Sequence, residues 1–521
     1  MISDNQMISG RQASWIFMLD MLAAGLFSLT AAKEQASSLT MLVGSLLTIG
    51  LVLIYYKASF CMFDQYEKKT GIRLSEQKLP GILCLLWLIF YLAGLIWALR
   101  FYCAVIADRI PVAYGRVLPI IFLMAALIYG AGKGMEVRGR MSELMGWLIC
   151  LPLILLFIFG LQQVIQSGCW RYLMVESVKQ EGGISLLLML KNGLAGAAFF
   201  LLSDQPLLLW RCIQRQNRRK GIYPVAFAGA GLMLLFSTGL TVCLLSPEGI
   251  AGERYPFGVV LQLIRFPGNF ISRYDIFFVM LWMMSFFVFA GGMLIHLTVA
   301  AKGLIRTENK DAKMDRKLAL LFGILITAGL LCGCYAEREP QNRNYIMCMG
   351  IDSDPEGGLK ISYGFPDLSA LTGTDAGEAE PMRVIAAASV SEASELLNAS
   401  SDKTTDYSQM PVILMGKDLF EDQEKRSQVM NELADEKTIR RTALIARAEH
   451  TAEDILQLDD DVHGSVGVFI YELCQNNYEN KGCTMSILEN FIGGRAGDET
   501  VIPVFENNSG IPEIIELIRY K

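Results

Sequence analysis

Long apolar blocks, separated by short polar loops, fill the first part of the chain. About twenty apolar residues cross the hydrocarbon core of a bilayer, and backbone polar groups in lipid must bond within their own segment. The pattern therefore predicts eight membrane-spanning helices and a ninth, shorter apolar run. The helices are expected at 13–31, 38–56, 80–106, 117–131, 144–163, 184–210, 222–245 and 275–300, and the short run at 318–333.

Beyond Cys334 the pattern changes, because no apolar run there is long enough to cross a bilayer. Apolar-rich runs at 345–351 and 359–363 flank the turn signal DSDPEGG and predict a β-hairpin. Short strands at 411–415 and 442–447 alternate with amphipathic helical stretches at 391–399, 419–434, 451–457 and 465–475. The fold class expected is an all-α polytopic membrane domain followed by an α+β domain.

Charge divides the chain at the same place. Residues 1–334 carry 30 lysines and arginines and 18 aspartates and glutamates, a net charge of +12, whereas residues 335–521 carry 16 and 34, a net charge of −18. With the N-terminus in the cytoplasm, the predicted inner loops hold 19 basic residues and the outer loops hold 8. The positive-inside rule then places the acidic C-terminal domain outside the cytoplasm.

Residues 314–334, MDRKLALLFGILITAGLLCGC, resemble the start of a bacterial lipoprotein. Basic residues precede an apolar stretch of signal length, and Leu331-Cys332-Gly333 would form a lipobox before Cys334. One interpretation is that Cys334 is lipidated and the chain is cut before it. The alternative is a ninth membrane helix that ends in two incidental cysteines.

Polar residues inside the predicted helices are the candidate ligand site, since an ionisable side chain in lipid costs several kcal/mol. Asp20 lies in the first segment, followed by Ala24 and Gly25, and Lys191 lies in the sixth. Glycine-interrupted helices that coordinate a substrate with unwound backbone are common in transporters. Asp20 and Lys191 would then form a buried pair or bind the two charges of an amino acid. The sixth segment adds Asn192, Gly193, Gly196 and Phe199, with Asp204 further on.

A structural interpretation of the same residues stays open. The glycines would be helix-packing contacts, Lys191 would extend to the interface and Asp20 would pair locally. Arg100 and His296 lie near segment ends, where extension to the interface explains both. Phe199 and other aromatic residues would line a pocket or face lipid.

The C-terminal part offers no catalytic constellation in its sequence, so an enzyme is not expected. The DSDPEGG turn resembles a calcium loop, but Tyr363 stands where a bidentate carboxylate is needed. His463 and Ser465, in HGSVG, lack the spacing of a nucleophile elbow. Neither a metal site nor a cofactor is expected, and neither is nucleic-acid binding.

The order of parts resembles two subunits of the Ger-type nutrient receptors of bacterial endospores, fused in one chain. Residues from about 7 to 307 resemble the B subunit, of the amino acid–polyamine–organocation transporter superfamily, and residues 314–521 resemble the N-terminal part of the lipoprotein C subunit. The stretches that carry the resemblance are ISGRQASWIFMLDMLAAGLFSLTA and RYPFGVVLQLIRFPGNFISRYDIFFVMLWMMSFF for the first part, and the lipobox run, NYIMCMGID and residues 406–456 for the second.

The resemblance implies a domain plan and a function. A permease-like membrane domain would cover 1–310, a lipoprotein-signal-like segment 311–334 and an extracytoplasmic germination domain 335–521. Members of this superfamily bind substrate at breaks in their first and sixth helices, which would fall here near Ala24-Gly25 and Asn192–Gly196. Two inverted five-helix repeats need more than eight segments, so the second repeat is incomplete.

The leading hypothesis is therefore a spore germination receptor component in the spore inner membrane. It would sense a nutrient such as an amino acid and relay the signal to an A subunit and other receptor subunits. The alternative is a secondary amino acid transporter with an appended extracytoplasmic domain.

Overall fold

A computed structural model describes residues 7–31, 38–72, 74, 77, 79–109, 117–167, 186–213, 222–245, 249–250, 255–264, 274–305, 312–331, 343–355, 357–366, 381–436, 438–460, 465–477, 484–491 and 500–519. The chain forms two compact units. The first comprises residues 1–163, 175–242 and 255–337, and the second comprises residues 164–174, 243–254 and 338–521.

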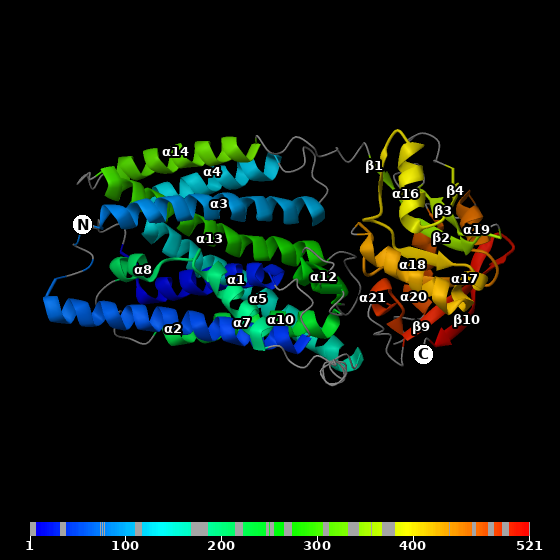
Figure 1. Cartoon of the computed structure of the whole chain (residues 1–521), viewed down its shortest axis with the longest axis horizontal. Coiled ribbons are helices and arrows are strands. Elements are labelled where there is room, and N and C mark those ends of the chain that lie inside the picture. Colours follow the sequence, from blue (N-terminus) through cyan, green and yellow to red (C-terminus); the bar gives the residue numbers. More distant parts are fainter. Residues whose placement is uncertain are drawn as a thin grey trace. The chain divides into compact units, whose positions relative to one another are not determined.

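Most described residues of the first unit are helical, and most of its helices are long (Figure 1). Helix α13 packs against α3, α1 and α4, whereas α7 packs against α1 and α2. The helices of this unit are α1 (Gly10–Ala31), α2 (Ser38–Thr70), α3 (Gly81–Arg109), α4 (Val117–Lys133), α5 (Met135–Ser167), α7 (Leu186–Phe200), α8 (Pro206–Cys212), α10 (Ile222–Leu244), α12 (Pro256–Leu263), α13 (Tyr274–Ile305) and α14 (Ala312–Leu331).

Several of these helices have the length and composition of membrane spans. Among the described residues, four qualify by both criteria: Ser38–Thr70, Gly81–Val105, Met135–Ile165 and Met284–Ile305. Large apolar side chains are exposed on them, for example Ile54 at 66% and Ile82 at 78%. A helix that is apolar on its outer as well as its inner face suits lipid rather than water. The chain is therefore a multi-pass membrane protein.

Each predicted membrane segment coincides with helix, but three details differ from the prediction. The sixth segment is divided, because α7 ends at Phe200 and α8 begins at Pro206. Helix α5 already begins at Met135, so Arg138 is helical and only 6% exposed, although it lies between the predicted segments 117–131 and 144–163 and therefore in a predicted inner loop. A short buried helix, α12, occupies part of the predicted outer loop before α13.

The second unit contains a mixed β-sheet with strand order β10-β9-β7-β6-β2-β3-β4, and β8 pairs with β9. Strands β2, β6, β7 and β9 run parallel, whereas β3, β4 and β10 pair antiparallel with their neighbours. The strands are β2 (Cys348–Ser353), β3 (Leu359–Gly364), β4 (Arg383–Ala387), β6 (Val412–Met415), β7 (Leu444–Ala448), β8 (Thr484–Met485), β9 (Thr500–Asn508) and β10 (Ile511–Arg519), with a separate parallel pair of β1 (Arg343–Tyr345) and β5 (Thr404–Asp406).

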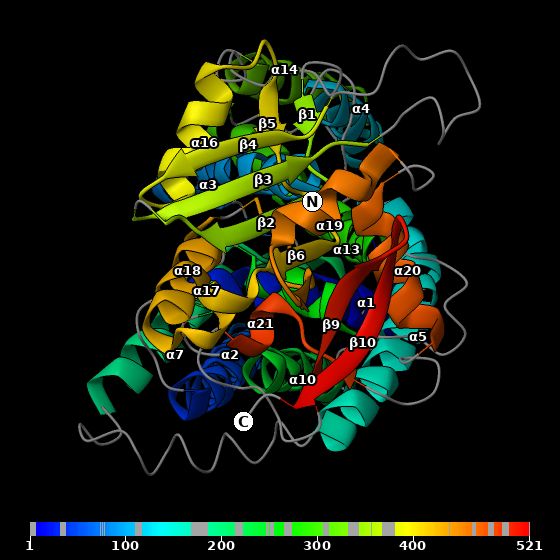
Figure 2. The ribbon, with the colours of Figure 1, turned by 90° about the vertical axis from the view of Figure 1, so that its right-hand side faces the viewer.

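Helices cover both faces of this sheet (Figure 2). Successive strand residues point to opposite faces, so Met349 joins one buried core and Cys348 the other. The first core also holds apolar residues of α16 (Val390–Ala399), α17 (Lys417–Glu421), α18 (Gln423–Asp435) and α21 (Leu488–Phe491), and the second holds those of α19 (Ala452–Leu456) and α20 (Val466–Asn477). The fold class predicted from the sequence is confirmed: a helical membrane domain is followed by an α+β domain.

The predicted local elements of this second unit are also confirmed. The hairpin is β2 paired with β3, and its turn contains Gly357 and Gly358 at φ of +98° and +102°. Glycine adopts these left-handed values without steric cost, which explains the GG in DSDPEGG. The strands expected at 411–415 and 442–447 are β6 and β7, and the expected helices are α16, α17 with α18, α19 and α20.

Candidate functional site

The candidate site is a cluster of buried charged residues in the membrane unit, and its first member is Asp20 of α1. Asp20 is 1% exposed. Both of its carboxylate oxygens accept hydrogen bonds from Nη2 of Arg138, each at 3.0 Å. The expected pair of Asp20 and Lys191 is not formed, since Lys191 is exposed on α7. The partner of Asp20 is thus an arginine that the sequence pattern had placed in a loop.

Arg138 bridges two carboxylates. Its Nη1 donates to Oδ2 of Asp204 at 2.5 Å, and its Nε donates to the backbone carbonyl of Val288 at 3.2 Å. Gly292 makes this approach possible, because a Cβ at this position would lie 2.5 Å from Nη2 of Arg138. The guanidinium group therefore connects α1, α5, α13 and the segment between α7 and α8.

His296 lies on the other side of Asp204. Its Nδ1 is 3.5 Å from Oδ1 of Asp204 and 2.8 Å from the carbonyl of Gly292, and its Nε2 accepts the backbone N–H of Gln205 at 3.1 Å. His296 is 1% exposed, so the expectation that it extends to the interface is wrong. The centroid of its ring lies 4.4 Å from that of the Tyr91 ring, and the two planes are tilted by 30°.

The interruption between α7 and α8, residues 201–205, is held by side chains from other helices. Tyr56 donates from its hydroxyl to the carbonyl of Asp204 at 2.6 Å, and Tyr91 donates to the carbonyl of Ser203 at 3.0 Å. Carbonyl groups freed at the end of a buried helix need such partners. Hydrogen bonds from other helices therefore stabilise this interruption, which lies next to the charged cluster.

The breaks expected at Ala24-Gly25 and at Asn192–Gly196 are absent, because α1 and α7 are continuous helices there. Ala24 and Gly25 are buried, and a Cβ on Gly25 would lie 3.0 Å from Cδ1 of Leu234 in α10. Gly25 is thus a packing contact.

Gly193 and Gly196 bring α7 close to α2. A Cβ on Gly193 would lie 2.8 Å from Cβ of Leu47, and one on Gly196 would lie 2.4 Å from Oγ1 of Thr48. The same Thr48 hydroxyl is 3.1 Å from the Gly193 carbonyl, to which it donates. This is the small-residue packing typical of membrane helices. Next to these glycines, the buried Nδ2 of Asn192 has no hydrogen-bond partner among the described residues.

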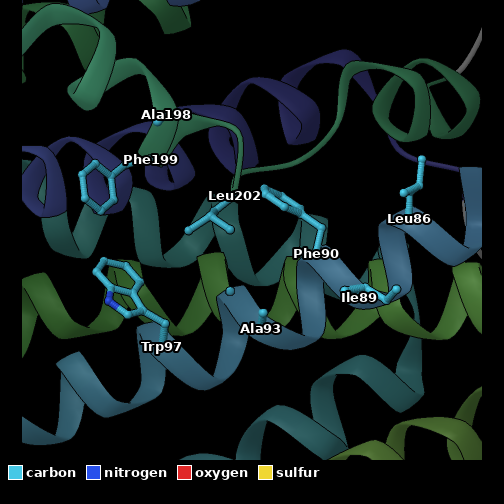
Figure 3. A pocket seen from close by; sticks show the side chains of 9 residues that line it. Leu86, Ile89, Phe90, Ala93, Trp97, Ala198, Phe199 and Leu202 are labelled. Carbon is cyan, nitrogen blue, oxygen red and sulfur yellow. The ribbon is translucent and has the colours of Figure 1, made fainter. Parts of the chain in front are cut away.

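Phe199 lines an apolar groove between α3 and α7 with a volume of about 630 Å³ (Figure 3). Its ring lies 5.4 Å from that of Trp97. The lining residues are Leu86, Ile89, Phe90, Ala93, Gly94, Trp97, Ala198, Phe199 and Leu202. This lining supplies no charged side chain, and Trp97 and Phe90 are 40% and 39% exposed. The groove therefore suits an apolar group or a lipid chain rather than the two charges of an amino acid.

In the second unit, Asp352 has a structural role. Its carboxylate oxygens accept the backbone N–H groups of Ala452 and Glu453, at 2.7 and 3.1 Å, at the N-terminus of α19. Burial raises the pKa of Asp352 above its ordinary value, and these two hydrogen bonds partly oppose the increase. Ser465 likewise has a structural role, since its Oγ accepts a hydrogen bond from the backbone N–H of Gly467. The predicted lipidation site, Cys334, lies outside the described residues, as does His463.

Sequence reasoning identified Asp20 but missed its partners. Arg138 lies in MEVRGR, among other basic residues, and looks like part of a cytoplasmic loop. Asp204 lies in the short polar run Ser203-Asp204-Gln205, and His296 is a single polar residue near the end of an apolar segment. The available signal was charge balance, because a buried carboxylate requires a cation.

These features define a multi-pass membrane protein of permease type with an attached α+β domain. A family profile described as "Spore germination protein" matches residues 7–338, and one described as "Spore germination protein N-terminal domain" matches residues 336–507. The chain belongs to the spore germination protein family, with a germination permease part followed by the N-terminal domain of a germinant receptor C subunit. The expected resemblance is confirmed.

Comparison with curated proteins gave no match. Among solved structures, the chain is similar to one titled "Substrate-bound outward-open state of a Na+-coupled sialic acid symporter". The two share 13% sequence identity and a TM-score of 0.43, over 61% of this chain and 72% of that one.

Proposed function

We propose that this protein is a germinant-sensing component of a spore receptor, which binds a nutrient such as an amino acid within its membrane unit. The observation that carries the proposal is the succession of two germination domains, matched over residues 7–338 and 336–507, in one chain. In this proposal the chain works in the spore inner membrane. It relays nutrient binding to an A subunit and other subunits of the receptor.

The nutrient site proposed lies among α1, α2 and α7. Asp20 and Asn192 are the ligand candidates with the best support, because Asp20 is a buried carboxylate and Asn192 has a buried amide nitrogen without a partner among the described residues. Of the other candidates, Ala24, Gly25, Gly193 and Gly196 would shape the backbone surface, and Phe199 would border the apolar side. Lys191 has weaker support, since it is exposed.

Spores that lack this gene test the proposal. We expect them to lose germination in response to one nutrient, and complementation with the intact gene to restore it. Asn192→Ala is expected to shift the effective nutrient concentration upward, whereas Leu194→Ala, an exposed position on the same helix that does not line the groove, should leave it unchanged. If spores that lack the gene respond to every nutrient as the parent strain does, the proposal is overturned.

The domain plan proposed is a membrane domain at 1–310, a signal-like segment at 311–334 and an extracytoplasmic domain at 335–521. Lipidation at Cys334 belongs to this proposal and has its own test. Metabolic labelling with a fatty acid should mark a fragment that begins at Cys334, and Cys334→Ser should remove the label. A single unlabelled full-length band would show that the segment is an uncleaved helix.

A further inference from the structure

The charged cluster in the membrane unit has an excess negative charge. Asp20 and Asp204 carry two negative charges, and Arg138 carries one positive charge. His296 is neutral in the hydrogen-bonding pattern observed, because Nδ1 donates to the Gly292 carbonyl while Nε2 accepts the N–H of Gln205. The four side chains are at most 6% exposed, so water does not screen the remaining charge.

The neighbouring helices do not supply the missing cation within the described part of the chain. Arg11 of α1 pairs with Glu143, and Arg140 of α5 pairs with Glu136. Arg211 of α8 donates to the carbonyl of Gln77. The titratable groups that face the cluster from α2 and α3 are the hydroxyls of Tyr56 and Tyr91, which donate to backbone carbonyls. The other cations whose side chains the structure describes on α2, α3, α4, α7 and α13 lie elsewhere. Lys302 is in the last turn of α13, and the rest are exposed: Lys57, Lys68, Lys69, Arg100, Lys133 and Lys191.

One oxygen of the cluster remains available. Oδ1 and Oδ2 of Asp20 and Oδ2 of Asp204 each accept a hydrogen bond from Arg138. Oδ1 of Asp204, by contrast, is buried and accepts none from the described residues. A buried carboxylate oxygen without a donor is unfavourable unless it gains a proton or a cation.

We propose that the cluster is a proton-binding site and that the proton resides on Oδ1 of Asp204. The proton is taken from water and forms a neutral carboxylic acid, so the four-residue cluster becomes electrically neutral. Arg138 and Asp20 remain an ion pair, and Oδ2 of Asp204 remains the acceptor for Arg138.

Proton binding at this position would affect the interruption between α7 and α8. Asp204 is part of that interruption, and its neighbours Ser203 and Gln205 are bound by Tyr91 and His296. Ionised Asp204 attracts Arg138 of α5 more strongly than the neutral acid does. Gain or loss of the proton therefore changes how strongly α5 holds the segment, which gives the membrane unit two states that differ by one proton.

Infrared difference spectroscopy of the full-length protein in lipid bilayers tests this site. A protonated buried carboxylic acid has a carbonyl band that an ionised carboxylate lacks. We expect such a band at neutral pH, shifted when the protein is labelled with carbon-13 at the aspartate carboxyl. Asp204→Asn should remove the band. Asp352→Asn is the matched control, because it removes the buried Asp352 of the other unit and should leave the band in place.

Asp204→Glu keeps the experiment decisive if Asp204→Asn does not fold. In protein labelled with carbon-13 at aspartate, this variant should show an acid band at the unshifted frequency, because the protonated carboxyl group then belongs to an unlabelled glutamate. His296→Gln should retain the shifted band. No aspartate-derived acid band in the wild-type protein at neutral pH, or a band that Asp352→Asn removes, would overturn the proposal. Nutrient response is not needed for this measurement, so its outcome is independent of the sensing role.

Discussion

At the residue scale, the membrane unit depends on one arginine that holds two carboxylates. Arg138 contacts Asp20 and Asp204, and all three are buried. Removing one member of a buried ion pair leaves an uncompensated charge, which is more costly than the pair is favourable. An ionisable residue inside an apolar segment could be predicted from the sequence, as Asp20 was. Its partner could not, because the contact joins residues 118 positions apart and depends on the packing of α1 against its neighbours.

Arg138→Met is expected to destabilise the membrane unit by about 3–5 kcal/mol, because it leaves the buried carboxylate of Asp20 without its cation and the buried carboxyl group of Asp204 without its donor. Arg140→Met is the control, since it removes an arginine two positions away whose pair with Glu136 is exposed. Such exposed pairs contribute about 1 kcal/mol or less. Thermal unfolding of both variants in detergent measures the difference. Equal losses would contradict the role given to Arg138.

Asp352 predicts a pH dependence for the second unit. Its pKa in the folded protein is raised above the ordinary value of 3.8, so the folded state binds this proton more tightly than the unfolded state. The stabilisation is complete below the ordinary pKa and is lost as the pH rises through the folded pKa. Asp352→Asn should therefore reduce the loss of stability between acidic and neutral pH.

Pulse proteolysis of the full-length protein across a urea series, followed on the C-terminal unit, measures this loss. Asp402→Asn removes an exposed aspartate of the same unit and should keep the wild-type dependence. If the stability of Asp352→Asn changes with pH as steeply as that of the wild-type protein, Asp352 does not contribute to the pH dependence.

At the element scale, the positions of helices and strands follow from periodicity, whereas helix breaks do not. The hairpin, the two parallel strands and every apolar segment were predictable, because each is an apolar run of the length that its element requires. The break was predicted at Asn192–Gly196 but occurs at residues 201–205. The glycines of α7 serve close packing with α2, and the break is held by Tyr56, Tyr91 and His296 from distant parts of the chain.

The contact between α2 and α7 can be tested with one added methyl group. Gly196→Ala places a Cβ 2.4 Å from Oγ1 of Thr48, a hydroxyl that already bonds the carbonyls of Gly44 and Gly193. Overpacking of this kind costs about 1–3 kcal/mol. Gly50→Ala in α2 is the control, because a Cβ there meets nothing within 4 Å. Thermal unfolding should separate the two, and a Gly196→Ala protein as stable as Gly50→Ala would show that the helices are less tightly packed.

At the scale of the whole molecule, the chain combines parts suited to two solvents. Residues 1–334 carry a net charge of +12 and long apolar helices, whereas residues 335–521 carry −18 and form a sheet covered on both faces. This division was predictable from composition alone. The buried charges were not, since they make up a small fraction of the chain and only the fold brings them together.

The proposed orientation predicts which side of the membrane the acidic unit occupies. In sealed vesicles with their cytoplasmic face outward, added protease should leave residues 335–521 intact and cut the loop between α13 and α14. Vesicles opened with detergent supply the control, in which loops on both faces become accessible. Digestion of the C-terminal unit in sealed vesicles would show that this unit lies on the cytoplasmic side. It would remove the basis for a sensor that faces outward.

The central claim is that the membrane unit senses a nutrient, and the most direct measurement is binding and uptake of labelled amino acids by the full-length protein in proteoliposomes. The account predicts saturable binding of the nutrient to which the spores respond, weakened in Asn192→Ala, without sustained accumulation under a proton or sodium gradient. Accumulation driven by either gradient would identify a transporter instead. No binding of any nutrient that triggers the spores would contradict the claim.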